Sequence, residues 1–109
     1  MNQKISRDEI NARLNAGDHI TIVEALPERY YNAEHLPGAI NIPHDAIRER
    51  AASALPDKDA TIVVYCANTE CQNSKIATQA LMAMDYRNVL EYVEGKKDWK
   101  DAGLPLRKL

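Results

Sequence analysis

The segment ATIVVYC, residues 60–66, is the most apolar part of the 109-residue chain, and it decides the fold. Its apolar residues form a near-continuous run, as is typical of a central parallel strand that is covered on both faces. A helical pattern follows at 73–85, where Ile76, Ala80 and Met84 recur at helical spacing. We therefore expect a buried strand, a short polar loop and a helix.

Strands and helices alternate on both sides of this unit. Ser6 and Glu9 form a capping-box pattern at the start of a helix over 6–17. Further strands are expected at 19–25, 38–43 and 88–94, and further helices at 27–35, 44–55 and 96–103. The alternation predicts an α/β fold, with a mostly parallel central sheet of four or five strands and helices on both faces. Residues 1–109 are expected to form one domain.

The composition is that of a packed globular chain and argues against several classes of function. Hydrophobic residues make up 45% and charged residues 28% of the chain. The net charge of −2, with both signs interspersed, argues against a nucleic-acid partner, which usually requires clustered Lys and Arg. We find no secretory signal and no apolar run near the ~20 residues of a membrane helix. We expect a cytoplasmic protein without a membrane partner.

Both cysteines of the chain, Cys66 and Cys71, lie in the loop region after the apolar strand. Cysteines in a cytoplasmic protein are more often reactive or metal-binding than structural. The three histidines are scattered and no CxxC or HxxxH pair occurs, so we expect no metal site. Thiol chemistry is the remaining interpretation.

Cys66 is placed where a reactive thiol is expected. Ligands of parallel sheets bind at the carboxyl ends of the strands, and Cys66 ends the most apolar strand. The helix that follows presents N-terminal amides and the positive end of its dipole, which favour a thiolate. A buried structural thiol is the alternative, but the polar loop after Cys66 favours the reactive interpretation.

Three segments of the chain together resemble the signatures of rhodanese-like domains. EHLPGAINIP at 34–43 matches the family's central motif nearly residue for residue, and EGKKDWKDAGLPL at 94–106 is similar to its C-terminal motif. The strand that ends in Cys66, followed by a loop and a helix, is the third signature. The resemblance covers about residues 5–106 and implies the three-layer rhodanese-like fold. The C-x-x-x-x-C-x-x-S pattern from Cys66 to Ser74 resembles a subset of the family.

This resemblance implies a sulfurtransferase that needs no cofactor. Cys66 would take sulfur from a donor such as thiosulfate or a polysulfide, become a persulfide, and pass the outer sulfur to cyanide, a thiol or a protein acceptor. Backbone amides of the loop would stabilise the anionic sulfur. The implied substrate-binding loop comprises Ala67, Asn68, Thr69, Glu70 and Gln72, with supporting roles for Glu24, Asn73 and Ser74.

The loop departs from the family pattern in its length and its charge. It is one or two residues longer than usual, and in related phosphatases an enlarged loop accommodates phosphate. Those phosphatases end the loop with an Arg that clamps the oxyanion, and no Arg lies between Cys66 and Ser74. Glu70 would repel a dianion. A phosphatase is therefore disfavoured, and so is thiosulfate as the preferred donor.

Two further departures concern positive charge near the site. Leu26 stands where the family often has an Arg, and Lys96 replaces the second Gly of the C-terminal motif. Lys96 or Lys97 could supply charge to the pocket, although we expect both to be solvated surface lysines. We expect Ser74 to be a helix N-cap and His35 to have a structural role.

Cys71 has two interpretations, and it leaves alternative functions open. It could pack the underside of the loop, or it could resolve a persulfide or sulfenate on Cys66. A curled loop could bring the two Cα atoms into the roughly 4.4–6.8 Å range of a disulfide, which a thiol reductant would then reduce. The alternatives to a sulfurtransferase are therefore a thiol-disulfide or arsenate-type oxyanion reductase and a non-catalytic sulfur-sensing module.

Overall fold

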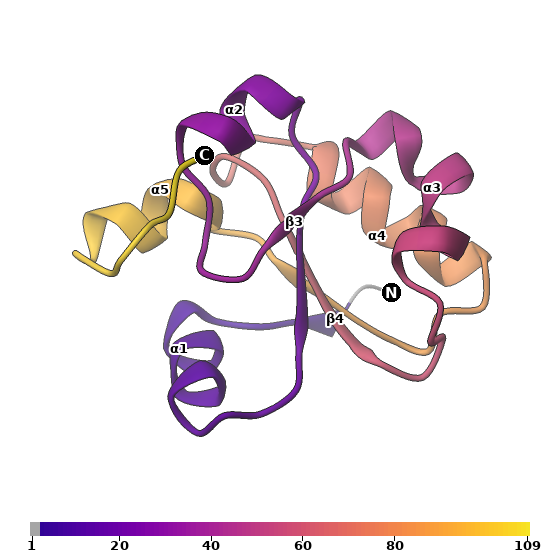
Figure 1. Ribbon diagram of the computed structural model, residues 1–109, viewed down its shortest axis with the longest axis horizontal. Helices are drawn as coiled ribbons and strands as arrows, with labels where there is room; N and C mark the ends of the chain where they lie inside the picture. The colour runs from indigo at the N-terminus through magenta and orange to yellow at the C-terminus, as the bar shows by residue number, and fades with distance from the viewer. Residues whose placement is uncertain (1–2) are drawn as a thin grey trace.

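The computed structural model describes residues 3–109, which contain a five-stranded sheet with every strand pair parallel (Figure 1). The strands are β1 (Gln3–Lys4), β2 (Thr21–Glu24), β3 (Ile40–Asn41), β4 (Thr61–Tyr65) and β5 (Asn88–Tyr92). Their spatial order is β1-β5-β4-β2-β3. The apolar segment at 60–66 therefore supplies the central strand, as predicted.

Helices cover both faces of this sheet and complete a three-layer α/β fold. They are α1 (Arg7–Asn15), α2 (Glu28–Ala33), α3 (Ile47–Ala54), α4 (Asn73–Ala83) and α5 (Gly95–Asp101), with a 3-10 turn η1 (His44–Ala46). Buried side chains of α3 and α4 pack on one face of the sheet, and those of α1 and α5 pack on the other. Figure 1 shows these two pairs of helices on opposite sides of the strands. The predicted fold class is confirmed.

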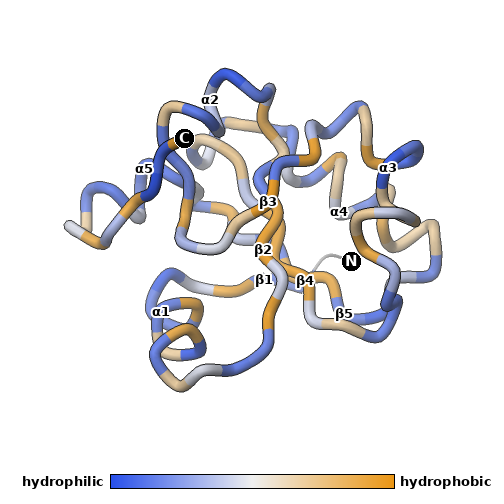
Figure 2. Tube along the Cα trace, viewed as in Figure 1, coloured by the Kyte–Doolittle hydropathy of each residue, from blue (hydrophilic) through white to orange (hydrophobic). Residues whose placement is uncertain are grey.

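The two-sided burial of β4 explains its continuous apolar run. Ile62 and Val64 lie in the core beneath α3 and α4, whereas Val63 and Tyr65 lie in the core beneath α1 and α5. Successive side chains of a strand point to opposite faces, so a strand covered on both faces needs apolar residues at every position. In Figure 2 the hydrophobic colour is accordingly concentrated along the central strands.

The elements differ from the sequence predictions most clearly at β1 and at residues 44–55. Gln3–Lys4 forms an edge strand that was not predicted, because two exposed polar residues carry no strand pattern. The expected helix over 44–55 divides into η1 and α3. The capping pattern at Ser6 is confirmed, since its Oγ accepts the Glu9 N–H at 3.2 Å.

No helix within residues 3–109 is long and apolar enough to cross a membrane.

Candidate active site

Cys66 follows β4 directly and lies at the carboxyl edge of the sheet, between the ends of β2 and β5. Only 1% of its surface is exposed. The segment after it curls tightly, because Asn68 accepts the Cys71 N–H through its carbonyl at 3.2 Å and the Glu70 N–H through its Oδ1 at 3.0 Å. The curl returns the chain to Cys66 before α4 begins.

Cys66 and Cys71 form a disulfide, with their Cα atoms 6.3 Å apart. The separation lies within the range expected for the curled loop. Cys71 is half-buried, whereas Cys66 is fully covered. The structure thus brings together the two sulfurs that the sequence placed in one loop, in the oxidised state.

Ser74 connects the Cys66 sulfur to a buried carboxylate. The Ser74 Oγ lies 3.4 Å from Sγ of Cys66, and its hydroxyl donates to Oε2 of Glu91 at 2.9 Å. Ser74 is 1% and Glu91 6% exposed. The prediction that Ser74 is the N-cap is wrong: Gln72 holds that position, and Ser74 is the second residue of α4. Its hydroxyl is directed to Cys66 and Glu91 rather than to the helix amides.

The start of α5 holds the beginning of the loop through backbone contacts. The Lys96 N–H donates to the Cys66 carbonyl and the Lys97 N–H to the Ala67 carbonyl, both at 2.9 Å. Gly95 permits this approach: its φ is +72°, and a Cβ there would lie 2.6 Å from the Cys66 carbonyl oxygen. Any other residue at 95 would therefore displace the loop or α5.

A buried ionic network lies beneath the site, on the β2 side. Glu24 is 0% exposed, and its carboxylate accepts the Tyr65 hydroxyl at 2.6 Å and the Lys96 ammonium at 3.0 Å. The same ammonium donates to the backbone carbonyls of Tyr30 and Glu34. Burial raises the pKa of Glu24, while the hydrogen bonds from Tyr65 and Lys96 oppose that rise. Burial, followed by the Glu24 charge, raises the pKa of Tyr65.

The two lysines after Gly95 therefore have different roles, against the expectation that both are solvated. The Lys96 side chain is 13% exposed and is committed to Glu24, so it compensates a buried carboxylate instead of lying in solvent. Lys97 is 67% exposed and pairs with Asp101, as expected for a surface lysine. Leu26 is buried and takes no part in this ion pair.

The other predicted site residues surround the loop. Ala67, Asn68 and Asn73 are partly buried, and Thr69, Glu70 and Gln72 are exposed. His35 has the expected structural role: it stacks on Tyr31 with ring centroids 4.0 Å apart, and its Nδ1 lies 2.9 Å from the Tyr31 carbonyl oxygen.

Sequence reasoning missed Gly95 and Glu91 as site residues and did not find the partner of Lys96. One local signal was present for Glu91, which is a carboxylate inside the otherwise apolar middle of the strand VLEYV at 89–93. Gly95 was quoted within a motif, but its closeness to the Cys66 carbonyl depends on the packing of α5.

The chain is therefore an α/β protein with a cysteine at the ligand-binding edge of its parallel sheet, followed by a curled loop and a helix N-terminus. Residues 6–102 match the family described as the Rhodanese-like domain. The chain belongs to the rhodanese-like domain family.

Three relatives illustrate the match. The HTH-type transcriptional regulator Rv0324 of Mycobacterium tuberculosis is 38% identical over 103 residues, which cover 94% of this chain and 43% of that protein. The thiosulfate sulfurtransferase PspE of Escherichia coli is 45% identical over 73 residues, covering 67% of this chain and 66% of that protein. The crystal structure of a Pseudomonas aeruginosa thiosulfate sulfurtransferase superposes with a TM-score of 0.87 at 28% identity, over 98% of this chain and 20% of that one.

Both curated alignments cover less than two thirds of the relative's own length. The family and the fold are established for this chain by the match over residues 6–102 and by the structure. Whether the chain shares the activity of either relative is addressed below as a proposal.

Replacing Lys96 tests the buried ion pair. Lys96→Met leaves Glu24 buried without its cation, so the pKa of Glu24 rises further above its ordinary 4.5. When the pKa of a group is higher in the folded than in the unfolded state, the stability that it contributes is present at pH values below the unfolded-state pKa. That stability is lost as the pH rises through the folded-state pKa. We expect the variant's free energy of unfolding to fall by about 3 kcal/mol at neutral pH and by less near pH 4.5, measured by urea denaturation. Lys97→Met is the matched control and should change little, and equal losses in the two variants would contradict the assignment.

Replacing Glu91 tests the contact chain from the sulfur to the carboxylate. In a Cys71→Ser background, Glu91→Gln removes a buried negative charge that disfavours a Cys66 thiolate. We expect alkylation of Cys66 to become several-fold faster at neutral pH, with the midpoint of the pH–rate profile moved to lower pH. Glu70→Gln removes an exposed, solvent-screened charge next to Cys71 and should have the smaller effect. A larger effect of Glu70→Gln would disprove the coupling.

Proposed function

We propose that this chain is a sulfurtransferase that carries a persulfide on Cys66. The observation that carries the proposal is the position of Cys66. The residue directly follows the central strand, and its Sγ lies 3.4 Å from Oγ of Ser74 in the first turn of α4. The first N–H groups of a helix have no intrahelical acceptors, so they are available to an anionic sulfur at that end. The 45% identity to a protein named thiosulfate sulfurtransferase supports the same activity.

The proposed reaction has two balanced steps and begins from the reduced protein. The Cys66 thiolate attacks the outer sulfur of thiosulfate, or the equivalent sulfur of a polysulfide; a new S–S bond forms, and sulfite or the shortened polysulfide leaves with the electron pair. A nucleophilic acceptor then attacks the outer sulfur of the persulfide and regenerates the Cys66 thiolate. Helix N-terminal and loop amides stabilise the anionic sulfur in both steps. The step requires no cofactor.

Access to Cys66 sets a condition on this reaction. Cys66 is 1% exposed and bonded to Cys71 in the oxidised state, so the disulfide must be reduced before a donor can reach the nucleophile. In the cytoplasmic location that we propose, cellular thiols would keep the pair reduced.

A second candidate function, thiol-disulfide reduction, is favoured by the disulfide itself. After persulfide formation, the Cys71 thiolate could attack Sγ of Cys66 and expel hydrosulfide, leaving the Cys66–Cys71 disulfide. The 6.3 Å Cα separation is compatible with this product. In that case the chain would reduce a sulfane sulfur to sulfide, with the disulfide as its oxidised product.

One experiment distinguishes these functions. The reduced protein is incubated with thiosulfate or a polysulfide, with and without cyanide, and is followed by intact and peptide mass spectrometry and by thiocyanate formation. We expect a gain of one sulfur on Cys66 and its transfer to cyanide, with loss of both in Cys66→Ser and retention of both in Cys71→Ser.

Other results would decide against the proposal. Thiocyanate formation by Cys66→Ser at the wild-type rate would exclude Cys66 as the carrier. Sulfide release with a two-hydrogen mass loss, in wild type but not in Cys71→Ser, would favour the reductase. A Cys66 thiol that reacts with none of the donors would favour the non-catalytic sensing module.

A further inference from the structure

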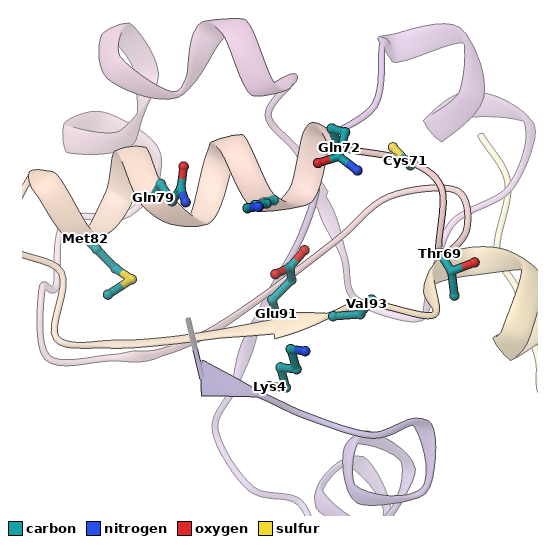
Figure 3. A pocket seen from close by; sticks show the side chains of 9 residues that line it. Lys4, Thr69, Cys71, Gln72, Gln79, Met82, Glu91 and Val93 are labelled. Atoms are coloured by element: carbon teal, nitrogen blue, oxygen red, sulfur yellow. The ribbon is translucent and has the colours of Figure 1, made fainter. Parts of the chain in front are cut away.

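A cavity of about 640 Å³ lies beside the loop, between α4 and the edge of the sheet formed by β5 and β1. In Figure 3 Cys71 lies at the end of the cavity where the loop joins α4, and Met82 lies at the other end. Its volume is within the usual range for small-molecule sites, roughly 300–1,000 Å³. The cavity is therefore large enough for a ligand of peptide size that reaches the disulfide.

The two sulfurs of the disulfide differ in their relation to this cavity. Cys71 is one of the lining residues and is half-buried, whereas Cys66 does not line the cavity and is 1% exposed. Thiol-disulfide exchange depends on which sulfur the attacking thiolate can reach. A nucleophile in the cavity therefore meets the Cys71 sulfur.

The charges on the cavity walls favour an anionic ligand. Lys4 on β1 and Lys75 on α4 lie on opposite sides of the cavity and are exposed. Gln72 and Gln79 lie on the same face of α4 as Lys75, at spacings of three and four residues, and add neutral amides. The lining carboxylate of Glu91 accepts the Ser74 hydroxyl at 2.9 Å. Two ammonium groups on opposite walls match a ligand with more than one carboxylate.

From these observations we propose that the cavity binds a low-molecular-weight thiol bearing carboxylates, which reduces the disulfide by attack on Cys71. The ligand's thiol lies toward Cys71 and its carboxylates lie near Lys4 and Lys75. The volume of the cavity is that of a small-molecule site, which favours a small thiol over a protein reductant. The inference rests on the proposed function only through the identity of Cys66 as the reactive thiol.

The exchange consists of two thiolate attacks. The ligand's thiolate attacks Sγ of Cys71, an S–S bond forms between them, the Cys66–Cys71 bond breaks, and its electron pair leaves on Cys66 as a thiolate. A second thiolate of the same class attacks the ligand's sulfur in the mixed disulfide and releases Cys71 as a thiolate. Two ligand thiols are oxidised to one ligand disulfide, and the protein disulfide is reduced to two thiols.

The test uses the oxidised 109-residue chain with three thiols at equal thiolate concentration and low salt. Glutathione carries two carboxylates and one ammonium group and is a net anion, 2-mercaptoethanol is uncharged apart from its thiol, and cysteamine carries only an ammonium group. We expect glutathione to reduce the protein roughly tenfold faster than 2-mercaptoethanol, because the cationic walls concentrate it, and cysteamine to be the slowest. Acid quenching during the glutathione reaction should trap the adduct on Cys71, located by peptide mass spectrometry.

Matched variants separate binding from sulfur reactivity. Lys75→Gln should slow reduction by glutathione several-fold without changing the rate with 2-mercaptoethanol. Lys108→Gln removes the same charge from an exposed position that does not line the cavity, and should change neither rate.

Three results would overturn the proposal. These are a glutathione adduct on Cys66, equal rates for glutathione and 2-mercaptoethanol, and reduction by the protein dithiol thioredoxin but by no small thiol. Neither a sulfur donor nor cyanide is present, so failure here is independent of the sulfur-transfer assay.

Discussion

The carboxylate of Glu24 is the group around which the site is organised. It is completely buried at the end of β2 and accepts hydrogen bonds from Tyr65 on β4 and Lys96 on α5. Tyr65 also accepts the Leu36 N–H at 3.1 Å, so the network extends to the segment between α2 and β3. A buried charge is tolerated only when it is paired and hydrogen-bonded. This requirement ties two strands, one helix and one connecting segment into a fixed arrangement directly beside Cys66.

The loop above that network combines opposing electrostatic effects. The N-terminus of α4 favours an anionic sulfur at Cys66, whereas Glu91, reached through Ser74, disfavours it. Lys4 and Lys75 line the neighbouring cavity, which Cys71 also lines and Cys66 does not. Positive charge is therefore available to an incoming anion, while the buried sulfur remains under the influence of a carboxylate. Such a balance suits the sulfur transfer that we propose for Cys66.

The fold could be predicted from the sequence because its determinants are local. Residues 60–66 needed apolar side chains at every position to serve as a strand with two covered faces, and the flanking helices carried periodic patterns and caps. The position of Cys66 followed from the same strand. β1 was not predicted because Gln3 and Lys4 pair with β5 through their backbone groups, and their side chains form no pattern that indicates a strand.

The surroundings of Cys66 were less predictable because they depend on contacts between distant segments. Lys96 and Glu24 are 72 residues apart in sequence, and nothing near either residue indicates its partner. Ser74 has the residue type of an N-cap, but α4 begins one residue earlier and the hydroxyl lies against Cys66 instead. The residues of the site and their approximate positions can therefore be predicted from the sequence. The direction in which a hydroxyl or an ammonium group points depends on contacts that only the assembled fold provides.

The contacts that Gly95 permits hold only the first half of the loop. Its missing side chain lets the first turn of α5 lie against the carbonyls of Cys66 and Ala67, which its neighbours hold by hydrogen bonds. The second half, from Thr69 to Gln72, is more exposed, and Cys71 is fastened to the first half by its sulfur. Breaking that bond removes the covalent tie between the two halves, whereas the hydrogen bonds from Lys96 and Lys97 to the first half remain. Cys66 thus lies in the half of the loop that α5 holds, whereas Cys71 lies in the more exposed half and is joined to the first half through its sulfur.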